Sequence, residues 1–149
     1  MTLDELLQSV EPTSWVEGLE PYQRRLVQTL LANSKDPEIA AKNWLEASTS
    51  QTFVFGAATA SRPFFDAVRR EVLRFLCNEN AYIEEKKKLL STRNVTQLFV
   101  VSVMTTAIAP VVGTASAFLA PVIALILYSL GKVALKAICE CNKSTWQDK

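Results

Sequence analysis

The sequence predicts an all-α fold: a small bundle of six to eight helices with a hydrophobic helical hairpin towards its C-terminal end. Apolar residues recur every three or four positions through residues 1–93, which is the spacing of one helix face. Helix-start signals precede several of these runs, and the one β-prone run, residues 52–55, has no second strand candidate nearby. A chain of 149 residues with these features is expected to form one structural unit.

The first three helices are predicted from their start signals. Thr2 and Glu5 form a capping box ahead of an apolar face. Pro21 suits the first turn of a second helix, and Asp36 followed by Pro37 marks the start of a third. The residues expected to face the core from these helices are Leu3, Leu6, Leu7, Val10, Tyr22, Leu26, Leu30, Ile39, Ala40, Trp44 and Leu45, with Val27 and Leu31 as further candidates on the second helix.

Residues 48–61 are predicted to be a packed loop, because they open with Ser-Thr-Ser and have no clear helical period. Ser61 and Pro63 then start an amphipathic helix. A further helix from Ala81 carries glutamates before lysines, an order that suits the helix dipole. The inward-facing residues of these two helices are expected to be Phe64, Phe65, Val68, Val72, Phe75, Leu76, Tyr82, Ile83, Leu89 and Leu90.

An uncharged segment is the most unusual feature of the chain. The whole chain is 21% charged, yet the 38 residues between Arg93 and Lys132 carry no charge. One helix of that length would be about 57 Å long, roughly twice the thickness of a bilayer's hydrocarbon core. Two shorter helices joined by a turn fit a membrane better.

We predict the first of these helices over residues 94–109, with Asn94 as its cap, and a turn over residues 110–116. Pro121 is placed in the first turn of the second helix, which continues through Gly131 towards Cys139. Residues 142–149 are predicted to be a frayed tail. The organisation is then an amphipathic helical region 1–93, an uncharged hairpin 94–131 and an amphipathic end 132–149 in a single unit.

Cations lie on both sides of the uncharged segment and none lie in its turn. The positive-inside rule then predicts that both chain termini are cytoplasmic and that the turn lies across or within the bilayer. The alternative is a cytoplasmic soluble protein whose amphipathic helices enclose the hairpin as a core. A third hypothesis combines them: the protein shields the hairpin and releases it on a trigger. The residues expected in the membrane hairpin are Leu98, Phe99, Val103, Ile108, Phe118, Leu119, Ile123 and Leu127.

Small residues at spacings of four predict close packing between the two hairpin helices, and they are Ala109, Gly113, Ala117 and Ala120. Two clusters of cations are candidate contacts for anionic lipid or a partner, although neighbouring acidic residues make a solvated face the simpler interpretation. The candidate residues are Arg69, Arg70, Arg74, Lys86, Lys87, Lys88, Lys132 and Lys136.

Catalytic chemistry has little support in this sequence. The chain has no His and only four Gly, so His-based catalysis and glycine-rich phosphate loops are excluded or disfavoured. Ser129 and Lys132 match S-x-x-K, but the companion motifs of serine β-lactamases are missing. We therefore expect no enzyme activity, no catalytic residues, no metal, no cofactor, no small-molecule substrate and no nucleic-acid partner.

The three cysteines are an odd set without a disulfide-framework spacing. This pattern, with an acidic start that does not resemble a secretory signal, favours a reducing, cytoplasmic compartment. Membrane lipid is the expected partner, with a protein partner or a second copy of the chain as further candidates. The layout resembles that of small bacterial membrane-acting effectors and immunity proteins, which is a likeness of architecture and assigns no residue roles. The sequence favours a non-enzymatic membrane protein, with a soluble helical adaptor as the alternative.

Overall fold

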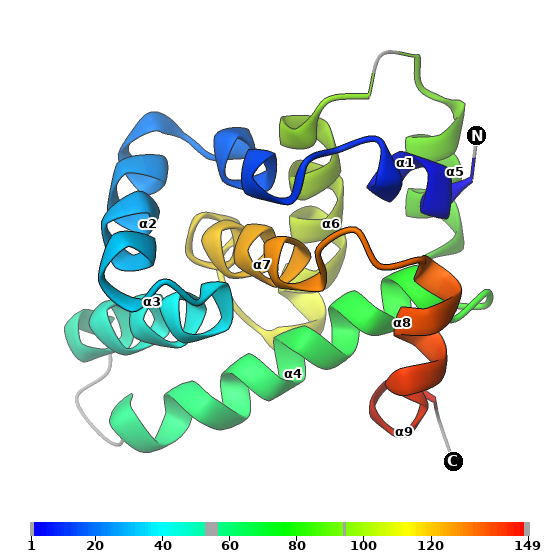
Figure 1. Ribbon diagram of the computed structural model, residues 1–149. Helices are drawn as coiled ribbons and strands as arrows, with labels where there is room; N and C mark the ends of the chain where they lie inside the picture. The colour runs from blue at the N-terminus through cyan, green and yellow to red at the C-terminus, as the bar shows by residue number, and fades with distance from the viewer. Residues whose placement is uncertain (1, 53–56, 94, 148–149) are drawn as a thin grey trace.

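Nine α-helices and one 3-10 helix make up the described part of the computed structural model, which covers residues 2–52, 57–93 and 95–147 (Figure 1). These residues contain no strand, so the all-α prediction is confirmed, while the number of helices exceeds the predicted six to eight. In chain order the elements are α1 (Leu3–Gln8), η1 (Pro12–Gly18), α2 (Pro21–Ser34), α3 (Pro37–Thr52), α4 (Ala57–Cys77), α5 (Ile83–Ser91), α6 (Gln97–Val112), α7 (Ser116–Leu130), α8 (Leu135–Cys141) and α9 (Lys143–Trp146).

Local capping chemistry sets the early helix boundaries as predicted. The Thr2 hydroxyl accepts a hydrogen bond from the Glu5 amide at 3.2 Å, which begins α1. The Asp36 carboxylate accepts from the Glu38 amide at 2.8 Å and so caps α3, which begins at Pro37. Between them, Lys35 ends α2 in the left-handed conformation at a φ of 60°.

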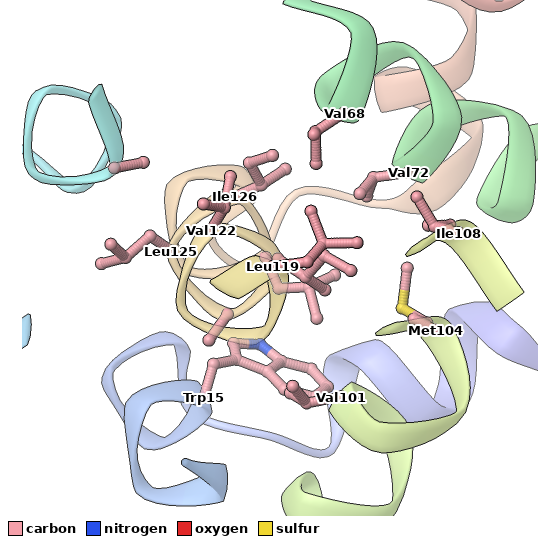
Figure 2. Close-up of a cluster of buried hydrophobic side chains, with 14 of the residues drawn as sticks. Trp15, Val68, Val72, Val101, Met104, Ile108, Leu119, Val122, Leu125 and Ile126 are labelled. Carbon is pink, nitrogen blue, oxygen red and sulfur yellow. The ribbon is translucent and has the colours of Figure 1, made fainter. Parts of the chain in front are cut away.

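α7 occupies the centre of the molecule (Figure 1). It packs against η1, α3, α6 and α4, and more lightly against α2. Figure 2 shows these elements around it, with Trp15 of η1 below, Val68 and Val72 of α4 above, and Met104 and Ile108 of α6 to one side. The rest of the fold is therefore arranged around one apolar helix.

The boundaries of α3, α4 and α6, three of the helices that surround α7, differ from the predicted ones. Residues 48–52 and 57–61 belong to α3 and α4, so the predicted loop over 48–61 is wrong for them, and residues 53–56 lie outside the described residues. α4 therefore begins at Ala57, ahead of the predicted start at Ser61 and Pro63. The predicted cap, Asn94, also lies outside the described residues, and Thr96 caps α6 by accepting from the Phe99 amide at 3.1 Å.

The predicted turn over 110–116 is too long. α7 begins at Ser116, so Pro121 lies inside the helix and not in its first turn as predicted. The predicted second helix also extends too far towards the C-terminus. α6 continues through Pro110 to Val112, and only three residues separate it from α7. α7 ends at Leu130, because Gly131 adopts a φ of 63° that an L side chain rarely takes. The tail is also more ordered than predicted: α9 forms, and the Trp146 indole donates to the Cys139 carbonyl at 2.9 Å.

The inner faces of α2, α3 and α5 differ in part from the prediction. Tyr22 and Leu26 are each 52% exposed, whereas Gln23 and Val27, one residue further along, face the core. The prediction that Tyr22 and Leu26 face inward is therefore wrong, whereas Val27, a further candidate on the same helix, is confirmed. Ile39 and Ile83 are also exposed, at 47% and 45%.

A disulfide joins Cys77 at the end of α4 to Cys139 in α8, with the two Cα atoms 5.6 Å apart. The bond spans a sequence separation of 62, and Cys141 remains free and exposed. This corrects the expectation that the cysteines form no disulfide. A cross-link limits the conformations of the unfolded chain, and the chain-entropy relation gives about 4 kcal/mol for a loop of this length.

We predict that replacing both Cys77 and Cys139 with serine lowers the free energy of unfolding by about 2–4 kcal/mol, because the unfolded chain regains its freedom. Urea denaturation monitored by circular dichroism measures this loss. Cys141→Ser is the matched control and should change stability by less than about 0.5 kcal/mol. Equal stability of the double variant and the control would show that the bond contributes nothing to folding.

Candidate functional site

The uncharged pair α6 and α7 is the candidate functional site, and its second helix is enclosed on every side. Seven consecutive residues of α7, from Pro121 to Leu127, are buried, together with Leu119. Consecutive residues point around the whole circumference of a helix, so a run of seven leaves no polar face. Within the described residues, no single helix has the length and apolarity to cross a membrane, although α6 and α7 meet these criteria as a pair bent by 115°.

The predicted membrane residues divide by helix. Leu119, Ile123 and Leu127 of α7 are at most 1% exposed, and Val103 and Ile108 of α6 are also buried. Phe99 and Phe118 are half-buried, and Leu98 is 55% exposed. α6 therefore has an outward side along its length, whereas the run from Pro121 to Leu127 in α7 has none.

The small residues at the turn are placed differently from the packing that was predicted for them. Gly113 ends α6 at a φ of 76°, and no atom lies within 4 Å of the position a Cβ would take there. Ala117 is exposed and Ala120 half-buried, while Ala109 is buried. In this conformation the close packing predicted at Gly113 and Ala117 is absent, and the glycine serves the turn.

A hydrogen bond from α2 completes the first turn of α7. Pro121 has no N–H group, so it cannot donate to the carbonyl of Ala117, four residues earlier. The Gln23 side-chain amide donates to that carbonyl at 2.6 Å. The Trp44 indole of α3 donates to the next carbonyl, Phe118, at 3.0 Å. Two of the covering helices are therefore attached to α7 through its backbone.

The seam between η1 and α6 allows no additional atom at one point. A Cβ on Gly18 would lie 2.9 Å from the backbone of Gln97 and Leu98, closer than real Cβ contacts. Nearby, Trp15 lies against Val101 of α6 (Figure 2) and is only 2% exposed. Gly18 thus lets η1 lie directly on the N-terminal turn of α6.

A hollow of about 250 Å³ opens along the same seam, between η1 and α2 on one side and α6 and α7 on the other. Thr105 lines it and is 3% exposed, and the Thr105 hydroxyl has no hydrogen-bond partner. A buried hydroxyl without a partner costs free energy, as does unfilled space. The seam therefore holds both unfilled space and a buried hydroxyl without a partner.

The candidate basic residues are largely engaged within the protein. Arg74 lies 3.1 Å from the buried Glu71 carboxylate and Arg70 lies 3.9 Å from it. The Arg69 guanidinium donates to Asn142 at 3.0 Å, and Lys132 pairs with Glu11 at 2.7 Å. Only part of the predicted basic surface is therefore available to an anion.

The remaining candidates lie on α5 and α8. The Lys86 ammonium donates to the Asn78 carbonyl at 2.6 Å, and burial lowers the pKa of Lys86. Lys87, Lys88 and Lys136 are exposed and form no ion pair among the described residues. These exposed lysines lie near the two ends of the uncharged pair in sequence.

Glu71 is the one buried acidic residue of the described core, and its partners account for it. It accepts hydrogen bonds from the Tyr82 hydroxyl at 2.6 Å and from Arg74 at 3.1 Å. Burial and the hydrogen bond to the Glu71 carboxylate raise the pKa of Tyr82. A charge that is paired and hydrogen-bonded in this way is a structural ion pair, so we assign it no reaction.

No group of His, Cys, Asp or Glu in the described part of the chain is arranged to hold a metal ion. Ser129, from the S-x-x-K match, donates to the Ile126 carbonyl of its own helix, and Lys132 pairs with Glu11. Neither residue faces a base or an oxyanion site. Comparison with known proteins adds no assignment: no family model, no curated protein and no solved structure matches this chain.

Sequence reasoning missed Gly18, Gln23 and the Cys77–Cys139 pair. Pro121 was a usable signal for one of them, since a proline inside a buried helix leaves a carbonyl that needs a donor from elsewhere. Nothing in the local sequence identifies Gln23 as that donor, because Gln23 and Ala117 are 94 positions apart along the chain. The same holds for the cysteine pairing, which sequence alone does not determine.

We predict that Gln23→Leu destabilises the protein by about 1–3 kcal/mol, because the Ala117 carbonyl then lacks a donor. The control is Pro121→Ala, which restores an N–H in α7 for the same carbonyl. In the Pro121→Ala background, Gln23→Leu should cost at least about 1 kcal/mol less. A double-mutant cycle by urea denaturation measures this coupling, and additive losses would refute the assigned role of Gln23.

Proposed function

We propose that this is a non-enzymatic membrane-binding protein of the binding or effector type. It carries α6 and α7 packed against its other helices and exchanges these protein contacts for lipid contacts. One observation carries the proposal: a helix pair without charges, whose second helix is apolar all round, is covered by separate amphipathic helices. A helix that is apolar on every side suits either a protein core or the hydrocarbon of a bilayer.

The lengths of the two helices favour insertion of the pair over two straight spans. α6 has 16 residues and α7 has 15, which correspond to about 24 Å and 22 Å. A hydrocarbon core is about 30 Å thick, so each helix is slightly short for it. Entry with the uncharged turn first, with local thinning of the bilayer, accommodates the pair.

The charges beside the pair support the same orientation. Lys87 and Lys88 precede it, Lys132 and Lys136 follow it, and the turn from Gly113 to Ala115 carries no charge. Lysines at both ends would remain with anionic headgroups while the turn enters the lipid. Both chain termini would then remain on one side, which we propose is the cytoplasmic side.

We call the elements that pack around α7, namely η1, α2, α3 and α4, the cover. The seam between η1 and α6 is the proposed place where this cover opens. It contains the hollow and the unpartnered Thr105 hydroxyl, and both lower the free energy that opening at this place would cost. The Gln23 and Trp44 hydrogen bonds hold α2 and α3 to α7 and would oppose opening. These two hydrogen bonds thus stabilise the closed conformation.

A second candidate function follows from the outer surface of α2 and α3. Tyr22, Leu26 and Ile39 are about half exposed there, and apolar side chains of this kind often contact protein partners. In this alternative the protein is a soluble adaptor or complex subunit, and α7 is only its core. The two functions differ in whether α6 and α7 ever separate from the helices that surround them.

Two exposed valines allow a matched test. Val111 in α6 is 57% exposed and Val133, beyond the uncharged pair, is 53% exposed, so aspartate at either position should leave folding intact. In lipid, aspartate at position 111 costs about 2–3 kcal/mol, which predicts a roughly 30-fold to 150-fold weaker vesicle affinity. Val133→Asp should bind within about threefold of the parent protein.

The measurement is flotation with vesicles of phosphatidylcholine containing about one third phosphatidylglycerol. Both aspartates are tested in the wild-type chain and in Gly18→Ala, whose added methyl group forces η1 away from α6. Flotation that Val111→Asp abolishes and Val133→Asp preserves supports the proposal. Failure of wild type and Gly18→Ala to float, or equal losses in both aspartate variants, would overturn it and favour the adaptor.

A further inference from the structure

The Cys77–Cys139 disulfide lies at the surface of the fold. Both cysteines are only half-buried, and both line an open hollow of about 520 Å³. The hollow has apolar, acidic and basic walls and is large enough for a small thiol compound. Exposed disulfides are the ones that exchange with thiols, whereas structural disulfides resist reduction.

The position of the Cys77–Cys139 disulfide means that its reduction would loosen the segment that follows α7. α7 ends at Leu130, and Cys139 follows nine positions later in α8, so the disulfide fixes the exit of α7 to the end of α4. The loop that it closes contains α5, α6 and α7 (Figure 1). The cross-link therefore restrains the segment that we propose to move.

The other connections at this place are non-covalent. The Leu135 amide donates to Asp4 at 2.8 Å, the Gln8 side chain donates to the Val133 carbonyl at 3.0 Å, and Lys132 pairs with the exposed Glu11. Each of these contacts is exposed or only partly buried, and such contacts contribute about 1 kcal/mol or less. The Arg69 guanidinium of α4 also donates to Asn142 at 3.0 Å, and Ile138 of α8 is buried, so after reduction only non-covalent contacts would hold α8 to α4.

We propose that Cys77–Cys139 is a thiol–disulfide exchange site, that its substrate is a small thiol such as glutathione, and that reduction frees α8 from α4 and allows α7 to leave. The last step rests on the proposed membrane function, whereas the exchange site does not. The disulfide would then be a lock on the closed conformation.

The exchange balances with two thiols. The thiolate of the first attacks one sulfur of the disulfide, forms a mixed disulfide, and displaces the other cysteine as a thiolate, which takes up a proton. The second thiolate attacks the sulfur of the first thiol compound and displaces the remaining cysteine, which is protonated in turn. The protein gains two electrons and two protons, and the two thiols leave as their own disulfide.

Cys141 is not required for this reaction. It lies two residues after Cys139 in the same helix, and residues two positions apart point about 200° from one another around a helix axis. The attacking thiol must therefore come from outside the chain. Cys141→Ser is a matched control that removes the only free thiol of the protein and leaves the disulfide intact.

The first experiment tests exchange in the folded Cys141→Ser protein. Glutathione is added without denaturant, iodoacetamide traps free thiols, and mass spectrometry counts the alkyl groups. We expect two alkyl groups per chain while circular dichroism still shows a helical protein. If trapping requires denaturant, the bond is a structural disulfide and the exchange site is refuted.

The second experiment tests the lock by flotation with the same vesicles. Reduced Cys141→Ser should bind about tenfold more strongly than its oxidised form, which corresponds to about 1.4 kcal/mol. The variant with serine at both 77 and 139 should match the reduced form without any reductant. Wild type and Cys141→Ser should respond to glutathione equally.

Gly18→Ala separates failure of the lock from failure of the membrane function, because it opens the seam without changing any cysteine. If Gly18→Ala floats while the reduced protein floats no better than the oxidised one, the lock is wrong and the membrane function stands. If Gly18→Ala and both redox forms of the protein fail to float, the membrane function and the lock are both wrong, and the exchange site is decided by the first experiment alone.

Discussion

A helix that is apolar on every side must be covered on every side, and α7 imposes this constraint on the whole chain. Its buried run from Pro121 to Leu127 is enclosed by η1, α3, α4 and α6, which all precede α7 and are spread over residues 12–112 of the sequence. The same run contains a proline, so its first turn needs a hydrogen-bond donor from outside the helix. Gln23 supplies that donor, which explains why a polar residue, 3% exposed, lies on the inner face of α2. The burial of apolar side chains and the need of the Ala117 carbonyl for a donor together determine where the surrounding helices lie against α7.

The contacts that the cover makes with α7 differ from one side of the helix to the other. On the side of α3, the Trp44 indole and close apolar packing attach it to α7. On the side of η1, a hollow and the unpartnered Thr105 hydroxyl lie in the seam. Hydrophobic burial is non-directional, so lipid could replace the apolar contacts of α7 at little cost. The hydrogen bonds to its first turn and the disulfide near its end are the contacts that lipid cannot replace. Under the proposed membrane function, release of α7 would therefore depend on a few polar and covalent links.

Features set by neighbouring residues could be read from the sequence, and features set by distant residues could not. The Thr2 and Asp36 caps and the burial of Leu119, Ile123 and Leu127 follow from short-range patterns. The phase of α2 does not, because Gln23 turns inward to a carbonyl 94 positions away. The disulfide likewise joins residues separated by 62 positions. The early end of α7 depends on Gly131, whose positive φ was missed because glycine is also tolerated within helices. For the candidate site, the uncharged segment was evident in the sequence, whereas its cover, its seam and its lock required the fold.

Methyl NMR in the presence of vesicles that carry nitroxide groups on their acyl chains tests the central claim most directly. Leu119, Ile123 and Leu127 are enclosed by protein in the closed conformation, and Val133 is an exposed reference outside the uncharged pair. If α7 exchanges its cover for lipid, the nitroxides will broaden the signals of these three buried residues strongly and leave Val133 sharp. If the broadening is confined to exposed methyl groups such as those of Leu98 and Val111, while the three buried residues remain sharp, α7 stays in the core and the account is wrong.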